Sequence, residues 1–337
     1  MIPIQTDTTL TWSQHLSRAL TSLPELIQQL ALPDDMLTEG LAAQAAFKLL
    51  VPRPYLSRIE VGNPQDPLLL QILPSAMEMQ AVPGYTTDPL AEAEHNPQKA
   101  IVHKYKRRLL VIAAGSCAVN CRYCFRRHFP YGENQLAQSE WQSVIDYLVA
   151  HPEVNEVIFS GGDPLMMKDA LLADKVRKLE ALPQIKRIRI HSRLPVVIPQ
   201  RVCEEMLSWI TSSRLDIVMV WHINHANEVD EEVILAATKL KQAGVTLLNQ
   251  GVLLKGINDT VEAQVALSEA VFKAGLLPYY MFTLDPVEGA AHFDISIEQA
   301  QRLMGKVAAE LPGYLVPRLA KEIPGKDAKT VFAPLTD

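Results

Sequence analysis

The sequence predicts an α/β protein whose main part is a partial (β/α)6 barrel. From residue 109 onward, six apolar, strand-like runs alternate with six segments of helical periodicity. Strands that are each followed by a helix pair in parallel through right-handed crossovers. Six such units are too few to close an eight-stranded barrel. The first hundred residues lack this alternation and are expected to form a separate extension.

The N-terminal extension, residues 1–100, is expected to be helical and rich in loops. Helical spacing covers Trp12–Leu20 and Asp34–Val51, and the second segment opens with acidic residues that suit a helix N-terminus. Between residues 51 and 97 proline recurs eight times, at positions 52, 54, 64, 67, 74, 83, 89 and 97. Proline at this density breaks up regular elements.

The barrel is expected to occupy residues 101–314, with a short C-terminal segment at 315–337. The predicted strands are Leu109–Ala114, Val157–Ser160, Ile185–Ile190, Ile217–Ile223, Val245–Leu254 and Pro278–Leu284. The predicted helices are Ser139–Ala150, Ala170–Leu182, Gln200–Ser212, Glu228–Ala243, Val261–Ala274 and Ile297–Leu311. In parallel barrels the chemistry lies at the carboxyl ends of the strands, so motifs there receive most weight.

Size and charge exclude some classes of function. The 337 residues can form one large domain or two smaller ones, and apolar and charged fractions of 48% and 21% are ordinary for a globular protein. A formal net charge of -6 argues against a nucleic-acid binder. The basic run Lys104–Arg108 is better explained as a site for an anionic ligand or as a solvated strand edge.

Targeting signals and disulfides are not expected. Residues Met1–Gln14 lack the basic and apolar regions of a signal peptide, and no apolar stretch approaches the about 18 residues of a membrane span. The chain has four cysteines, three of them clustered, which makes a disulfide framework improbable. A reducing cytoplasm is the expected location.

The clustered cysteines are the strongest chemical signal. Cys117, Cys121 and Cys124 form a C-x3-C-x2-C pattern directly after the first predicted strand, at the barrel mouth. Structural zinc usually takes four protein ligands, and no nearby cysteine supplies a fourth. A cubane iron–sulfur cluster on three thiolates would leave one iron open. A zinc ribbon or a chance group of buried thiols remains the alternative. Cys203 is expected to be a buried helical cysteine.

This spacing, with Tyr123 just before the last cysteine, resembles the radical S-adenosylmethionine (SAM) enzymes. The resemblance implies a [4Fe-4S] cluster whose open iron chelates SAM, which is cleaved reductively to a deoxyadenosyl radical. Gly161-Gly162-Asp163 follows the second strand. Alone it would indicate a tight turn, but in this context it resembles the family motif that holds the amino group of SAM. Tyr123 and this motif are therefore expected to contact SAM.

Further motifs resemble the lysine 2,3-aminomutases and occur in the same order from about His103 to Thr330. They are Cys124–Phe129, Ile190–Val197, His222–His225, Gly256–Asp259 and Pro324–Thr330. The resemblance implies that pyridoxal 5'-phosphate (PLP) forms a Schiff base with Lys329. Lys326 occupies a family glycine position, so two lysines lie in the segment. Without the resemblance, either would be taken for a solvated lysine of a charged tail.

The same resemblance implies the contacts of substrate and cofactor. Arg126 matches the arginine that pairs with the lysine carboxylate, and a guanidinium fork suits that role. Asp259 and Glu322 match the two acidic residues that hold the ε-ammonium, with glutamate in place of a family aspartate. Arg108 matches an arginine at the PLP phosphate. For each residue, an ordinary ion pair is the structural alternative.

The implied activity is isomerisation of L-α-lysine to β-lysine by migration of the amino group. The sequence ends at Asp337, without the cysteine-bearing extension of the clostridial type, and resembles the short bacterial branch. That branch makes (R)-β-lysine for attachment to elongation factor P by its lysyl ligase, and flavodoxin or ferredoxin would supply electrons. The rival functions are another radical SAM reaction (methylthio transfer or enzyme activation) and a non-enzymatic iron–sulfur protein.

Overall fold

The computed structural model describes residues 7, 9–92, 97–131 and 140–336. Nine strands in this part of the chain form one sheet, ordered as they occur in the sequence. They are β1 Ile101–Tyr105, β2 Arg108–Ala114, β3 Glu156–Gly161, β4 Arg187–Ser192, β5 Asp216–His222, β6 Thr246–Val252, β7 Leu277–Phe282, β8 Arg318–Lys321 and β9 Thr330–Val331.

Strands β2 to β8 are parallel, and β1 and β9 are antiparallel edge strands. The sheet order is linear between these two edges, so the barrel formed by the described strands is open. The six predicted strands correspond to β2 through β7, which confirms the partial α/β barrel. Strand β8 adds a seventh parallel strand, reached from β7 through the last helix.

The sequence did not predict β1, β8 and β9. Strand β8 has only two apolar residues between Arg318 and Lys321, and β9 has two residues in all. Strand β1 forms a tight hairpin with β2, in which Tyr105 pairs with Arg108. The basic run at residues 104–108 therefore lies in this hairpin, and both sequence interpretations of it remain open.

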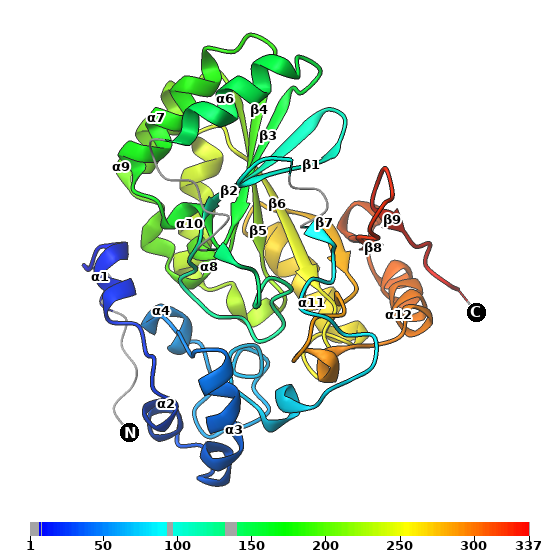
Figure 1. Ribbon diagram of the computed structural model, residues 1–337. Coiled ribbons are helices and arrows are strands. Elements are labelled where there is room, and N and C mark those ends of the chain that lie inside the picture. The colour runs from blue at the N-terminus through cyan, green and yellow to red at the C-terminus, as the bar shows by residue number, and fades with distance from the viewer. Residues whose placement is uncertain (1–6, 8, 93–96, 132–139, 337) are drawn as a thin grey trace.

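The barrel helices lie around the sheet (Figure 1). They are α6 Trp141–Ala150, α7 Asp169–Glu180, α8 Leu194–Val197, α9 Glu204–Ser212, α10 Glu231–Gln242, α11 Val261–Lys273 and α12 Ile297–Glu310. Ser139, the predicted start of the first of them, lies outside the described residues. Helix α9 begins later than predicted, so Cys203 is its half-buried N-cap residue and not a helical one.

The N-terminal extension contains α1 Trp12–Ser17, α2 Leu23–Gln29, α3 Asp35–Ala46 and α4 Arg53–Leu56. Helix α2 was not predicted, although Ser22 caps it and Pro24 lies in its first turn. Helix α3 ends before the predicted Val51. Val51 instead exchanges backbone hydrogen bonds with Leu20 at 2.8 and 2.9 Å, which holds residues after the helix extended.

One apolar core joins the extension to the barrel. Side chains of the extension such as Leu26, Leu56 and Leu69 are fully buried in the same cluster as Phe159 and Trp221 of the sheet. In Figure 1 the helices α2 to α4 gather at one end of the barrel. The extension is thereby placed where it can contact the loop that follows β2.

Candidate active site

A cavity of about 520 Å³ lies inside the barrel. Its lining includes Arg108, the first residue of β2, and the three cysteines that follow the end of β2, so it extends along the whole strand. Alternate residues of a strand face the same side. Accordingly Arg189 and His191 of β4 line the cavity, as do Gln250 and Val252 of β6. The inner face of the sheet is thus partly polar and open to a ligand.

The cysteine loop brings Cys117, Cys121 and Cys124 to this cavity as free, half-buried thiols. Burial and the neighbouring Cys121 raise the pKa of Cys124 to about 11, and burial likewise raises the pKa of Cys117. A bound metal would supply the positive charge that such buried thiolates need. Cys203 instead forms hydrogen bonds with Asp169 and Arg201, on another part of the barrel.

Three thiolates are the ligand set of a cubane that leaves one iron open. Among the described residues, no three His, Cys, Asp or Glu side chains converge on one ion position. A cubane does not require convergence, because each thiolate binds a different iron atom. The donor set is therefore the one expected for a cluster with one iron left open.

Gly161 and Gly162 hold the end of β3 against the cysteine loop. A β-carbon on either residue would lie 2.4 Å from a backbone oxygen, that of Ala114 or Ser116 respectively. The same contact carries the hydrogen bonds Gly162 N–H to Ala114 O and Asp163 N–H to Ser116 O, each 2.8 Å long. The sequence resemblance assigned these glycines to the motif that contacts SAM. Both do line the cavity, but the close approach in this structure is to the protein backbone.

Asp163 is buried and already has a full set of partners. Its carboxylate accepts hydrogen bonds from Ser192 Oγ and from the backbone N–H groups of Leu165, Arg193 and Leu194, at 2.8–3.0 Å. Burial nevertheless raises its pKa above the usual range. This residue joins β3 to the turn after β4 and so fixes the shape of the cavity wall.

The N-terminal extension clamps the cysteine loop through Arg122. The guanidinium is fully buried, forms a bidentate pair with Glu78 at 2.5 and 2.8 Å, and donates to the carbonyl oxygens of Phe47 and Ala43. Arg127 pairs with the same Glu78 carboxylate at 2.7 Å. One glutamate outside the barrel is thus the shared counter-charge of two arginines next to the cysteines.

Replacement of Glu78 with alanine is expected to destabilise the protein by about 3–5 kcal/mol, because it leaves two buried guanidinium groups without their counter-charge. Urea unfolding of the reduced, metal-free chain measures this. The control is Glu25→Ala, whose ion pair with Arg53 is 38–42% exposed and should be worth less than about 1 kcal/mol. Equal effects of the two substitutions would contradict the clamp.

A second buried arginine, Arg193, connects the loop to the rest of the site. Its Nη1 donates to Cys121 Sγ and to the Tyr123 hydroxyl, both at 2.8 Å. Its Nη2 donates to Gln71 at 2.7 Å and to Glu228 at 2.8 Å. Arg193 therefore places positive charge at one of the cysteines and ties it to both the extension and the barrel.

Tyr123 lines the cavity and stacks on His222, with ring centroids 5.7 Å apart and an interplanar angle of 18°. Its hydroxyl lies 3.0 Å from His222 Nε2. Burial, together with the charge of Arg193, lowers the pKa of His222 to about 3, so this imidazole is neutral. The pair forms a flat aromatic wall beside the cysteines.

Arg126 also lines the cavity, but its guanidinium is largely occupied. Two of its N–H groups bind the Glu92 carboxylate at 2.7 and 2.8 Å, and Nη1 donates to Ser160 Oγ and Gly161 O at 3.0 and 3.1 Å. A guanidinium has five N–H donors, so one is left. A ligand carboxylate must use that donor or displace Glu92, whose own side chain is 7% exposed.

Glu322 faces the cavity between two partners. Its carboxylate accepts hydrogen bonds from the Lys329 ammonium and from the Tyr105 hydroxyl, both at 2.5 Å. Burial alone would raise its pKa, but the charge of Lys329 and these two hydrogen bonds outweigh burial and lower it. Glu322 is therefore an anion within the site.

The second carboxylate that the structure brings to Glu322 is Asp285, not Asp259. Asp259 is absent from the cavity lining, and its carboxylate accepts the backbone N–H of Gly256 at 2.9 Å in the turn after β6. Asp285, after β7, lines the cavity. Burial and the charge of Glu322 raise its pKa to about 7. A cation bound here would lower that pKa.

Of the two candidate lysines, the structure places Lys329 in the cavity and Lys326 outside it, exposed to solvent. Lys329 precedes β9, and its Nζ lies 5.3 Å from the ring centre of Phe282. Arg108 is the cation suited to a cofactor phosphate. It stacks 4.0 Å from the Tyr105 ring centre and lines the same cavity. An amine, an aromatic surface and a guanidinium thus face one space, as a phosphorylated aldehyde such as PLP requires.

Sequence reasoning missed Glu78, Glu92, Arg193 and Asp285. Asp285 carried a signal, because it follows a predicted strand and so lies at the carboxyl edge of the sheet, as Asp259 also does. Glu78 and Glu92 lie in the proline-rich part of the extension, which gave no indication that it reaches the site.

The described residues include no helix that is long and apolar enough to cross a membrane.

Comparison with known proteins identifies relatives of the whole chain. The Radical SAM superfamily model matches residues 111–263. L-lysine 2,3-aminomutase of Haemophilus influenzae is 49% identical over 322 residues, covering 96% of this chain and 95% of the relative. The enzyme of that name from Escherichia coli is 50% identical, covering 95% and 93%. That of Clostridium subterminale is 31% identical, covering 96% and 78%.

Among solved structures, a radical SAM methyltransferase from Sphaerobacter thermophilus matches 66% of this chain and 68% of its own chain. Its identity is 15% and the TM-score is 0.48. The sequence relatives, not this structure, therefore carry the family assignment.

Proposed function

The chain belongs to the radical SAM lysine 2,3-aminomutases, and we propose that it moves the amino group of L-α-lysine from C2 to C3 to give (R)-β-lysine. One observation carries the proposal: a single cavity is lined by the three cysteines, Lys329 and the carboxylates that suit a substrate ammonium. A radical SAM enzyme that needs no PLP would have no use for the lysine.

The cysteines, Lys329 and Arg108 would hold the cofactors. Cys117, Cys121 and Cys124 would bind the [4Fe-4S] cluster, with Tyr123 and the backbone at Gly161-Gly162 beside SAM. Lys329 would attach PLP covalently, with Arg108 at its phosphate. When bound, cluster and SAM supply a radical that removes hydrogen from the substrate, and PLP supplies an electron-delocalising ring.

The residues of the chain bind and orient the substrate. Once the Lys329 amine is used by the cofactor, Glu322 loses its ammonium partner and becomes free to accept that of the substrate. Asp285 lines the same cavity and its pKa is raised by the charge of Glu322, so it would be the second carboxylate for this cation, in the role that sequence resemblance gave to Asp259. Arg126 would offer the substrate carboxylate its one remaining N–H, or that N–H and the two now bound to Glu92 if Glu92 moves. The cavity would hold the reacting groups in position.

Lysine binding is expected to depend on the ionisation of Asp285. Because the pKa of this carboxyl is about 7 in the ligand-free protein, it must lose a proton before it pairs with an ammonium. The KM for lysine should therefore rise about tenfold for each pH unit below 7. Asp285→Asn should remove this pH dependence and raise the KM at pH 8. Asp259→Asn is the matched control and should leave both unchanged; the reverse pattern would restore Asp259 to the site.

An anaerobic assay tests the function. The full chain, reconstituted with iron and sulfide, is incubated with L-lysine, SAM, PLP and dithionite, and products are separated by chromatography and mass. We expect β-lysine, and none when SAM, PLP or reductant is left out. SAM cleavage without β-lysine would favour another radical SAM reaction, such as methylthio transfer.

We further propose that flavodoxin or ferredoxin supplies the electrons and that the product serves the modification of elongation factor P. Similarity to the short bacterial branch supports this. Purified elongation factor P, incubated with its lysyl ligase, carbon-13-labelled β-lysine made by this chain and unlabelled α-lysine, should gain the mass of one labelled residue; the label is needed because the two isomers have equal masses. Modification that proceeds equally with α-lysine in competition would argue against this use of the product.

A further inference from the structure

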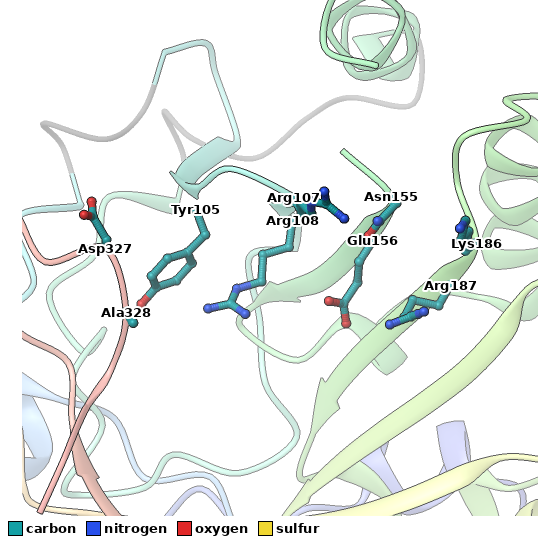
Figure 2. Close-up of a pocket in the computed structure, with 9 residues that line it drawn as sticks. All are labelled: Tyr105, Arg107, Arg108, Asn155, Glu156, Lys186, Arg187, Asp327 and Ala328. Carbon is teal, nitrogen blue, oxygen red and sulfur yellow. The ribbon is translucent and has the colours of Figure 1, made fainter. Parts of the chain in front are cut away.

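A second pocket, of about 630 Å³, lies at the opposite end of β2 from the cysteines. Arg108, Glu156 and Arg187 are the first residues of β2, β3 and β4, so the pocket lies where these strands begin. Figure 2 shows the side chains of these three residues directed toward its centre. Of the residues that line this pocket, the proposed function uses Arg108 and Tyr105, which also line the active-site cavity, and gives the other cations no role.

The pocket is strongly basic in a chain of net charge -6. Four cationic side chains line it, against the carboxylates of Glu156 and Asp327; the cations are Arg107, Arg108, Lys186 and Arg187. Glu156 is already paired with Arg189, at 2.8 Å. Among the described residues, no carboxylate lies within ion-pair distance of any of the four cations. Their charge is thus available to an anion from solution.

The basic pocket adjoins the active-site cavity. Tyr105, Arg108 and Ala328 line both spaces, and Ala328 directly precedes Lys329 in the chain. An anion drawn to Lys186 and Arg187 would therefore lie beside Arg108 and close to the segment that carries the lysine amine. Arg107, Lys186 and Arg187 are exposed and absent from the inner cavity, so they would act before the ligand reaches its final site.

We propose that this pocket is a loading port for the phosphate monoester PLP, in which Arg107, Lys186 and Arg187 attract the phosphate and pass it to Arg108. The inference rests on the proposed use of PLP by Lys329. A phosphate monoester carries nearly two negative charges at neutral pH. Clustered cations raise the association rate of such a ligand about tenfold or more, and salt suppresses the effect.

The test measures how fast the full chain, with its cluster reconstituted, captures PLP. The change in cofactor absorbance reports this rate. We expect the double variant Lys186→Gln/Arg187→Gln to slow capture about five- to tenfold at low ionic strength. At high salt the capture rates of the parent and the double variant should become nearly equal. Both proteins should bind the same amount of PLP at saturation. Arg107→Gln, on the hairpin, should show a smaller slowing of the same kind.

Two controls separate steering from structural damage. Lys273→Gln/Lys306→Gln removes the same charge from exposed positions on α11 and α12 and should capture PLP at the parent rate. Pyridoxal, which lacks the phosphate, should react with all variants at equal rates. Equal PLP rates for the two double variants, or an equal slowing with pyridoxal, would overturn the port. Failure of the proposed function would give a different result from failure of the port, because PLP capture by the parent chain would then not require Lys329.

Discussion

Replacement of Lys329 with alanine is expected to abolish β-lysine formation, with a loss of at least about a thousandfold, because no other described lysine in its segment faces the cavity. The variant should also lose the absorbance of the lysine–cofactor linkage. Borohydride reduction of the parent protein followed by peptide mass mapping should place the PLP mass on the peptide that contains Lys329.

Lys326→Ala is the matched control, since this lysine is three residues away, exposed and outside the cavity. It should retain both the PLP absorbance and the activity. Two results would assign the cofactor to Lys326 instead. One is a Lys329→Ala protein that keeps the absorbance of the lysine–cofactor linkage, and the other is a PLP mass found on Lys326 in the peptide map.

Replacement of Cys124 with alanine is expected to reduce iron content, the electron paramagnetic resonance signal of the reduced cluster, and SAM cleavage to background. A cubane held by three thiolates has no spare protein ligand, so the loss of one cannot be compensated from within the described site. The same result is expected for Cys117→Ala and Cys121→Ala.

The fourth cysteine of the chain supplies the control. Cys203 lies at the N-cap position of α9, and its thiol donates a hydrogen bond to Asp169, outside the cavity. Cys203→Ala should therefore keep its iron, its signal and its SAM cleavage. A loss of iron in this variant equal to that in Cys124→Ala would mean that the cluster is not defined by the three-cysteine loop.

The parallel barrel and the position of the cysteines could be predicted from sequence, because both depend on local patterns. Apolar runs such as Val157–Ser160 and the helical periodicity between them are visible within short windows. The cysteine loop follows directly after one such run, so its place at the barrel mouth comes from chain order alone. Short or charged elements such as β8 and β9 have too few apolar residues to give the same signal.

The partners of the site residues could not be predicted, because they are distant in sequence. Glu78 is 44 residues from Arg122, and Tyr105 is 217 residues from Glu322. The choice between Asp259 and Asp285 was equally beyond local patterns. Both follow a strand of the sheet, and only the fold shows that the first accepts a turn N–H while the second is half-buried in the cavity with Glu322.

The most direct test of the central claim uses lysine that carries nitrogen-15 at the α-amino group and carbon-13 throughout, mixed equally with unlabelled lysine. If the chain moves the amino group within one molecule, β-lysine should appear in only two forms, fully labelled and unlabelled, with the nitrogen-15 on C3. Product in which the nitrogen and carbon labels are scrambled between molecules, or no β-lysine under full reduction with SAM and PLP present, would contradict the aminomutase account.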